Sequence, residues 1–342
     1  MTKDDIRLLR LQGQHLLSPA PALEVASDLC GLQAQILSCA LHALRIRSGS
    51  TDVDGLVKSW TLRGTLHLFP QADLPLYIHR QGSPEDVCDT PWYRWICTKG
   101  EPGATPERER FFARLVVEQI AAGHDTREEL RQICRKAGMT EREESHVFHS
   151  WGGVMAELAQ LGVLCFQVRE EKSYRLCPAF APVPDIDAET ELARRYFTHF
   201  GPATLRDAAY FFHVPQARVK QWLARLPVEA LTAGGQTYYR LPCPAPVTDM
   251  PRCLLLAGFD QLMLGYRKED NPVLPPEHLR GIFSLAGMVS PAILLEGRVV
   301  GKWKQSGGRL SLTLFEPVDE AGRKHILSAA EALWPLRRVD WL

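Results

Sequence analysis

Hydrophobic residues in the middle of the chain recur first at helical spacing and then at strand spacing. They predict a long helix over 107–122, a second helix that begins after Thr126, and a third over about 143–161 that ends at Gly162. Two short apolar runs, 163–168 and 173–176, then flank a charged turn. Three helices followed by a β-hairpin predict a winged helix in this part of the chain.

The same order of elements is expected twice more. The pattern predicts helices over 189–200 and 204–212, a third helix opened by Pro215, and a hairpin that turns at Gly234-Gly235. The first hundred residues predict a more divergent copy, with helices over 6–17, 23–32 and 36–47 and a strand-rich wing over 60–69. Three winged helices favour a DNA-binding scaffold, although the same fold also serves protein contacts.

The last hundred residues change to strand patterns. Strands are expected over 252–264, 292–305 and 309–315, followed by a helix over about 320–333. Stretches rich in proline or glycine, at 97–106, 178–184 and 241–251, separate the segments. We therefore predict a helix-rich α+β fold, in which three tandem winged-helix modules precede a small β-rich, barrel-like C-terminal domain. The expected boundaries are 1–100, 101–184, 185–245 and 246–342.

Charge changes this picture only locally. The 342 residues contain 40 Lys and Arg against 40 Asp and Glu, so net charge gives no support to nucleic-acid binding. Two stretches are basic. The first, 194–226, has one acid, Asp207, against Arg194, Arg195, Arg206, Arg218, Lys220 and Arg225. The second, 297–315, has no acid and contains Arg298, Lys302, Lys304 and Arg309. Such runs either contact phosphates or form solvated faces.

Several other kinds of chemistry are not expected. The nine cysteines are odd in number, form no Cys-x-x-Cys pair and lie partly in apolar runs, so they predict reduced core residues. His146 and His149 lack the glutamate pattern of a zinc helix, and we predict no metal site and no cofactor. With no signal-peptide pattern and no long apolar stretch, a cytoplasmic, nucleoid-associated protein is expected.

The candidate chemistry lies in the segment Leu32-Gln33-Ala34-Gln35. Residues two apart point to opposite sides of a helix but to the same side of an extended segment. For both amides to point at one substrate group, the segment must be a helix end or a short extended turn. Gly31 permits such a break. We predict that Gln33 and Gln35 lie outside a regular helix interior.

Two such amides suit one particular reaction. Hydrolysis of an N-glycosidic bond passes through an oxocarbenium-like sugar, and an amide oxygen can hold a water and stabilise the developing charge. It cannot accept a proton at neutral pH, so the leaving base must depart easily. A purine alkylated at N7 or N3 is already cationic and leaves as a neutral base. Gln33 and Gln35 are therefore our candidate catalytic residues for alkylated purines.

A second segment strengthens this interpretation. Residues 60–68 read Trp-Thr-Leu-Arg-Gly-Thr-Leu-His-Leu, and with the Gln-x-Gln triplet they resemble the HTH_42 winged-helix family of bacterial alkylpurine DNA glycosylases, in its AlkZ-like branch. The sister branch has aspartate in the place of Gln35. The resemblance continues in 258–260, 266–267 and 297–303. It implies a monofunctional DNA glycosylase of DNA repair, acting on N7-alkylguanine, N3-alkyladenine, and bulky adducts or interstrand crosslinks.

The remaining candidates are DNA contacts. On an alternating strand, Arg63, Thr65 and His67 share one face, from which they could reach a lesion or a phosphate; the alternatives are an ion pair for Arg63 and a turn cap for His67. From the two basic stretches we add Arg218, Lys220, Lys302 and Lys304. Trp92, Tyr93 and Trp95 could stack on bases or could belong to the core.

The expected partner is double-stranded DNA containing alkylated purines, bound by a monomer with no membrane association. The alternative function is a non-catalytic winged-helix transcriptional regulator, for which both glutamines would be incidental. A regulator of that kind is usually a dimer that binds two half-sites.

Overall fold

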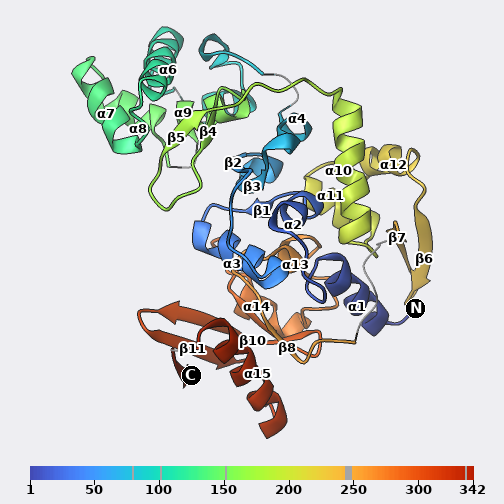
Figure 1. Ribbon diagram of the computed structural model, residues 1–342. Coiled ribbons are helices and arrows are strands. Elements are labelled where there is room, and N and C mark those ends of the chain that lie inside the picture. The colour runs from blue at the N-terminus through green and yellow to red at the C-terminus, as the bar shows by residue number, and fades with distance from the viewer. Residues whose placement is uncertain (79–80, 101, 151, 243–248, 336) are drawn as a thin grey trace. The chain divides into compact units, whose positions relative to one another are not determined.

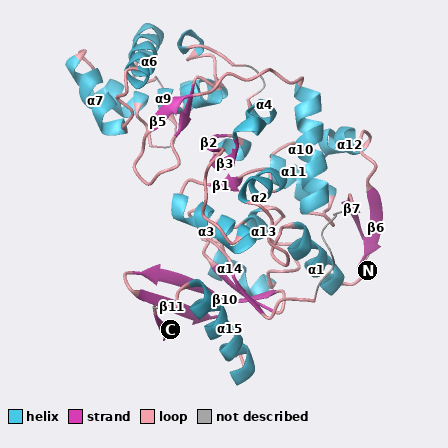
Figure 2. Ribbon diagram, in the orientation of Figure 1, coloured by secondary structure: helices cyan, strands magenta, loops and turns pink. Residues whose placement is uncertain are grey.

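The computed structural model describes residues 1–78, 81–100, 102–150, 152–242, 249–335 and 337–342 (Figure 1). The chain forms two compact units, one of Met1–Asp54 with Glu189–Leu342 and one of Gly55–Ala188. Helices account for most of the regular structure, as Figure 2 shows, and the fold is a helix-rich α+β fold. The boundaries of these two units differ from those of the four domains expected from the sequence. The division of the chain into four domains stays a prediction.

The first unit begins with three helices, α1 (Lys3–Gly13), α2 (Ala22–Asp28) and α3 (Leu37–Ser48), with the short strand β1 (Leu32–Gln33) between the last two. Thr2 starts α1 in a capping box with Asp5, and Gly49 ends α3 in the left-handed conformation at φ 72°. All three helices were predicted, with ends displaced by a few residues.

The same unit continues with a second set of three helices. They are α10 (Asp185–His199), α11 (Leu205–Phe212) and α12 (Gln216–Leu223), and the hairpin of β6 (Glu229–Ala233) and β7 (Gln236–Arg240) follows them. The hairpin turns at Gly234 and Gly235, both at positive φ, as two-residue turns require. Aromatic rings of Tyr196, Phe200 and Phe211 pack between these helices. The predicted order of helices and hairpin over residues 189–241 is confirmed, whereas the winged-helix assignment stays a prediction.

A five-stranded sheet with the order β12-β11-β10-β9-β8 completes this unit. Its strands are β8 (Cys253–Leu255), β9 (Ala292–Leu295), β10 (Arg298–Ser306), β11 (Arg309–Leu314) and β12 (Arg338–Trp341). Helix α15 (Glu320–Leu333) packs against it around Leu255, Ile293 and Ile326. Short helices α13 (Gln261–Leu264) and α14 (Leu279–Ile282) lie between β8 and β9 in the chain. Among the described residues no pairing joins β12 to β8, so the barrel is not confirmed.

The second unit has a sheet in which β3, β2, β4 and β5 follow one another. The strands are β2 (Leu56–Trp60), β3 (Leu66–Pro70), β4 (Leu164–Phe166) and β5 (Tyr174–Leu176). The helices are α4 (Leu74–Tyr77), α5 (Pro91–Cys97), α6 (Pro106–Ala121), α7 (Arg127–Lys136), α8 (Glu141–Val147) and α9 (Gly153–Gln160). The apolar core of this unit includes the buried side chains of Phe112, Val116, Leu130 and Leu158.

Three predicted elements were wrong in detail. The helix expected over 143–161 is divided into α8 and α9, because Gly153 at φ 75° turns the chain where a Cβ would meet the carbonyl oxygens of His146 and Val147. The strand expected over 252–264 ends at Leu255, since the Asp260 side chain caps the helix α13. The strand expected over 60–69 is interrupted by a 3-10 turn, Leu62–Gly64.

Two further observations concern segments outside these elements. No helix in the described ranges is both long and apolar enough to cross a membrane. Residues 243–248 of the proline-rich stretch at 241–251, Cys243 among them, lie outside the described residues.

Candidate active site

Gln33 and Gln35 lie on a short extended segment that leads into α3. After α2 the backbone takes two consecutive left-handed residues, Cys30 at φ 52° and Gly31 at φ 82°, and it becomes extended at Leu32. Helix α3 begins only at Leu37. The prediction that the triplet lies outside a helix interior is confirmed, and the sharp turn at Gly31 is what permits it.

The two amides contact each other. Nε2 of Gln33 donates to Oε1 of Gln35 over 3.1 Å, so both side chains lie on one side of the segment, as the extended geometry predicts. Gln33 is 8% exposed, whereas Gln35 is partly exposed. The buried amide therefore orients the more accessible one, whose oxygen retains a second lone pair for another donor.

The backbone before the triplet is held by a buried side chain from a distant part of the sequence. Nε2 of Gln261, in α13, donates to the carbonyl oxygen of Gly31. The neighbouring Asp260 forms two bonds with Arg47 of α3, at 2.7 and 2.9 Å, and both side chains are fully buried. These contacts give Asp260 of the 258–260 motif a structural role, because they hold α13 against the residue before the triplet and against the C-terminal end of α3.

Tyr266 belongs to a second buried polar cluster. Its hydroxyl donates to the carbonyl oxygen of Phe200 over 2.9 Å and accepts from Nε2 of Gln14 over 3.0 Å. The guanidinium of Arg10 lies 3.6 Å from the centre of its ring and pairs with Asp207 at 3.4 Å. Burial raises the pKa of Tyr266 well above its ordinary value. The motif at 266–267 is thus part of the scaffold.

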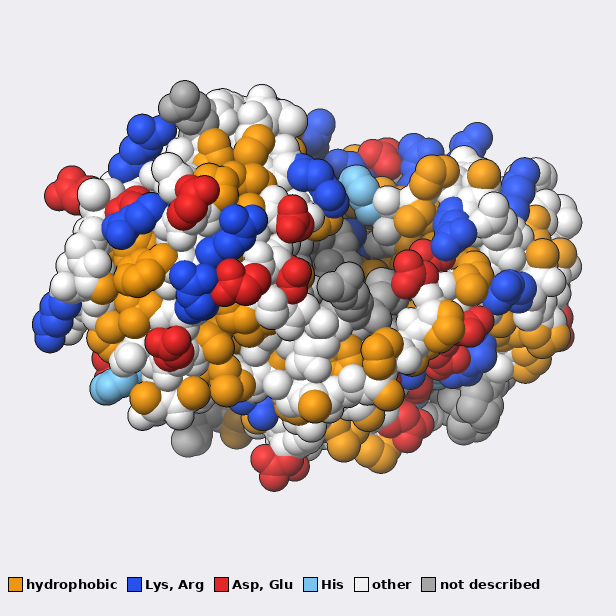
Figure 3. Space-filling view, turned by 90° about the horizontal axis from the view of Figure 1, so that it is seen from above, with side chains coloured by type: hydrophobic (Ala, Val, Ile, Leu, Met, Phe, Trp, Pro, Cys, Tyr) orange, Lys and Arg blue, Asp and Glu red, His pale blue; other side chains and the backbone are white. Residues whose placement is uncertain are grey.

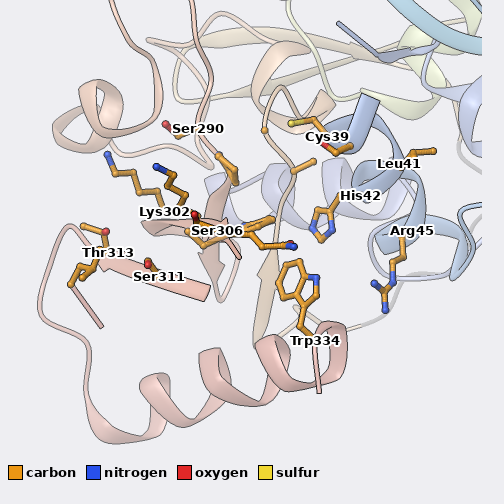
Figure 4. A pocket seen from close by; sticks show the side chains of 18 of the residues that line it. Cys39, Leu41, His42, Arg45, Ser290, Lys302, Ser306, Ser311, Thr313 and Trp334 are labelled. Atoms are coloured by element: carbon orange, nitrogen blue, oxygen red, sulfur yellow. The ribbon is translucent and has the colours of Figure 1, made fainter. Parts of the chain in front are cut away.

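The face of α3 that follows the glutamines lines a cavity of about 910 Å³ (Figure 4). Its contributions come from α3 and from the sheet and helix at the C-terminal end of the chain. The ring of His42 stacks on Trp334 at a centroid distance of 5.3 Å and meets the edge of Trp303 at 5.1 Å. Burial lowers the pKa of His42, so the imidazole is neutral at physiological pH.

The lining of this cavity is positively charged. It includes Arg45, Lys302 and Lys304 and, among the described residues, no Asp or Glu side chain. Lys302 and Lys304 alternate with the buried Trp303 along β10, which turns both amines to one side of the sheet. The structure thus gathers two of the candidate DNA contacts with a third cation, an arrangement that suits an anionic backbone.

His42, Arg45 and Trp334 were missed in the sequence. Ser38, Leu41, His42 and Arg45 follow the triplet at the i, i+3, i+4, i+7 spacing of one helix face, so this signal was available. The contribution of Trp334 has no such local signal, because it depends on how α15 packs.

The prediction that His67 shares an accessible strand face with Arg63 and Thr65 is wrong, because its side chain is not exposed. It is fully buried in β3, and its Nδ1 lies 2.8 Å from the hydroxyl oxygen of Thr61. Burial and the charge of Arg63 lower its pKa to about 3. Arg63 and Thr65 are half-buried in and after the 3-10 turn, where Arg63 has φ 57°. The turn, rather than a regular strand, sets their directions.

The basic stretch at 194–226 is partly neutralised by acids just before it. Glu191 pairs with both Arg194 and Arg195, at 2.7 and 2.8 Å, because residues three and four apart meet on a helix. Glu189 pairs with Arg218 at 2.6 Å, whereas Lys220 is exposed. The excess of bases is therefore smaller than the count from Arg194 onward indicated.

The aromatic residues of α5 separate into two groups. Tyr93 packs against the apolar core of the second unit, and Trp92 lies 5.4 Å from the ring of His146. Trp95 is 53% exposed. Of the three rings, Trp95 is therefore the one accessible for stacking.

The candidate site thus combines the hydrogen-bonded amides of Gln33 and Gln35 with a cavity whose lining includes three cations. The family model for AlkZ-like DNA glycosylases matches residues 26–335. An interstrand DNA cross-link repair glycosylase from Streptomyces sahachiroi is 30% identical over 346 positions, covering 90% of this chain and 88% of the relative.

The fold agrees with this match. The solved structure of Streptomyces sahachiroi DNA glycosylase AlkZ superposes with a TM-score of 0.75 at 24% identity, over 100% of both chains. The chain belongs to the AlkZ-like family of DNA glycosylases, enzymes that hydrolyse N-glycosyl bonds in DNA. This membership favours the enzyme over the regulator considered from the sequence.

Proposed function

We propose that this glycosylase excises cationic alkylated purines, N7-alkylguanine and N3-alkyladenine, from double-stranded DNA. The observation that carries the proposal is the hydrogen-bonded amide pair of Gln33 and Gln35, one buried and one partly exposed. Gln35 holds the attacking water with its amide oxygen and stabilises the oxocarbenium-like sugar, while Gln33 fixes the orientation of Gln35.

The leaving group decides the substrate range. Neither amide titrates at neutral pH, so this pair supplies hydrogen bonds and no strong acid or base. A purine that carries positive charge leaves as a neutral molecule, whereas a neutral base must be protonated on departure. The product is an abasic site and a free base. Bulky adducts and interstrand crosslinks are included in the proposal because the Streptomyces relative is named for crosslink repair.

We assign DNA backbone contacts to Arg45, Lys302 and Lys304 of the cavity, with Arg63, Thr65, Arg218 and Lys220 as further candidates. The two segments built of helices followed by a hairpin, residues 106–176 and 185–240, are proposed to be winged helices. The protein is proposed to act as a monomer.

The substrate test compares duplexes that differ in one base. The purified enzyme is incubated with DNA containing N7-methylguanine, uracil or 8-oxoguanine, and alkali then cleaves the abasic sites. Strand breaks are expected only for N7-methylguanine. Equal cleavage at uracil would show that an acid or carboxylate outside the amide pair carries the reaction.

Variants test the two roles. Gln35→Ala should lower the single-turnover rate on N7-methylguanine by about 10- to 100-fold, the usual effect of losing one positioned hydrogen bond. Gln33→Ala should lower it by a smaller factor, because Gln35 stays in place but is less well oriented. Gln35→Asp should retain activity and acquire a pH dependence. Gln132→Ala, an exposed glutamine in α7, is the control. Wild-type rates in both site variants would contradict the proposal.

A further inference from the structure

The ends of three helices in the first unit bring together His15, Asp28 and His199. Asp28 is the last residue of α2, His199 is the last residue of α10, and His15 follows the end of α1 by two residues. Nε2 of His15 lies 2.8 Å from Oδ2 of Asp28, and Nε2 of His199 lies 3.3 Å from Oδ1. One nitrogen or oxygen of each residue lies within 4.8 Å of the others.

Hydrogen bonding fixes which nitrogen of His199 faces the cluster. Its Nδ1 lies 3.0 Å from the carbonyl oxygen of Gly13, which can only accept, so Nδ1 carries the proton. In the neutral ring the lone pair is then on Nε2 and points to a carboxylate oxygen that also only accepts. A cation between these two acceptors satisfies both. Histidine ligands of metals have this arrangement, in which the second ring nitrogen donates to a carbonyl or carboxylate.

The surroundings also favour a cation. The carbonyl ends of α1, α2 and α10 meet here, and the helix dipole places partial negative charge at each C-terminus. The side chains of His15, Asp28 and His199 are only 8%, 19% and 8% exposed, so the charges are poorly screened by water. Two nearby cations oppose binding, Arg194 and Arg195, but both pair with Glu191.

We propose that His15, Asp28 and His199 bind one Zn²⁺ ion. A tetrahedral zinc ion with bonds of about 2.0–2.2 Å separates its ligand atoms by about 3.4 Å. The two imidazole–carboxylate distances here are 2.8 and 3.3 Å, and the ligand atoms all lie within 4.8 Å of one another. Two imidazoles and one carboxylate leave one position for water. An octahedral ion would require three more ligands, for which this buried site offers little access.

The metal would have a structural role near the segment that carries the proposed catalytic glutamines. Gly13 packs so tightly against the backbone of His199 that a Cβ there would lie 2.6 Å from its carbonyl oxygen, so α1 and α10 already meet at this point. A zinc ion would add α2, whose last residue Asp28 precedes Gln33 by five positions. The site would thereby hold the start of the segment that carries the glutamines. Its ligands lie at or just after the ends of three helices, α1, α2 and α10, which is why no sequence motif indicated it.

The test uses the full-length protein stripped with a chelator and titrated with Zn²⁺ against a chromophoric competitor. One ion per chain is expected, confirmed by elemental mass spectrometry, and Zn²⁺ should raise the midpoint of thermal unfolding. His15→Gln, Asp28→Asn and His199→Gln should each weaken binding at least tenfold. His124→Gln, an exposed histidine in the second unit, should bind as the wild type does.

A second measurement does not depend on the variants folding. Co²⁺ added to the stripped wild-type protein should give the intense visible absorption of a tetrahedral complex, and Zn²⁺ should displace it. Failure of the wild type to bind one equivalent of Zn²⁺, unchanged binding in folded Asp28→Asn, or the weak bands of octahedral Co²⁺ would each overturn the proposal. Because metal content and spectra are measured without DNA, these outcomes are independent of the substrate proposed above.

Discussion

At the residue scale, the most consequential contact is the ion pair between Arg47 and Asp260. Both side chains are fully buried, and Arg47 also donates to the carbonyl oxygens of Gln14 and Ala43. Every guanidinium nitrogen therefore has an acceptor. An unpaired charge left in such a site has no water to replace its partner.

Asp260→Asn should destabilise the protein by about 3–5 kcal/mol, because it leaves Arg47 buried without its counter-charge. Urea denaturation followed by circular dichroism would measure the loss. The matched control is Glu296→Gln, which breaks the exposed pair of Arg252 and Glu296 and should change stability by less than about 0.5 kcal/mol. Equal losses in the two variants would show that burial does not determine the value of the pair.

A second residue-scale feature is the buried carboxyl group of Glu157 in α9. One of its oxygens accepts from the backbone N–H of Cys88 over 3.0 Å and from the hydroxyl of Thr90 over 2.6 Å. Burial raises its pKa to about 7. Glu109, equally buried, faces the same region and is 2.5 Å from Nε2 of His146.

The raised pKa predicts that stability falls as pH rises. The folded state holds the Glu157 proton more tightly than the unfolded state, so its contribution is complete below the ordinary pKa of 4.5 and is lost as pH rises through about 7. The loss should be about 3 kcal/mol. Glu157→Gln, which keeps the shape of the protonated acid, should flatten the curve of unfolding free energy between these pH values. A curve as steep as that of the wild type would contradict the assignment of the effect to Glu157.

At the scale of elements, the turn between α2 and α3 decides where the glutamines point. Cys30 and Gly31 both have left-handed backbone conformations, and only glycine adopts this conformation without steric cost. The turn allows the extended triplet to form before α3 begins.

Gly31→Ala should cost about 1–2 kcal/mol of stability and lower the glycosylase rate, because relaxation of the strained turn moves the triplet. Gly49→Ala provides the control at the other end of α3. Gly49 has φ 72°, and nothing lies within 4 Å of an added Cβ, so it carries the same backbone strain away from the glutamines. Unfolding free energies should fall in both variants, and single-turnover rates only in Gly31→Ala. A normal rate in Gly31→Ala would show that the triplet does not depend on this turn.

At the scale of the whole molecule, charge is distributed rather than concentrated. On the face shown in Figure 3, Lys and Arg side chains lie interspersed with Asp and Glu, in agreement with the formal net charge of zero. We therefore expect attraction to DNA to come from local sites, and the cavity lined by Arg45, Lys302 and Lys304 is the proposed one.

Replacing Lys302 and Lys304 by glutamine should weaken binding to undamaged duplex uniformly across sequences. It should also reduce the slope of log K against log salt concentration by about two, since each phosphate that is no longer neutralised lowers the slope by about one. Fluorescence anisotropy over a range of salt concentrations would measure it. The double variant Lys136→Gln with Lys324→Gln removes two exposed lysines outside the cavity lining and should leave the slope unchanged. The same slope in both double variants would place Lys302 and Lys304 away from DNA.

The sequence by itself determined the features that depend on neighbouring residues. Periodicity and caps located the helices and hairpins, and Gly31 placed Gln33 and Gln35 on an extended segment. These follow from backbone geometry within a few residues, which is why α1, α3 and α10 to α12 were predicted closely.

Only the tertiary structure decided which distant residues meet. It buried His67, placed Asp260 on Arg47, added the parallel strand β12 to the sheet and set Glu189 against Arg218. It also brought His15, Asp28 and His199 together from three helices. Each of these outcomes depends on packing between elements far apart in the chain, where burial and the pairing of charges select partners that no local pattern records.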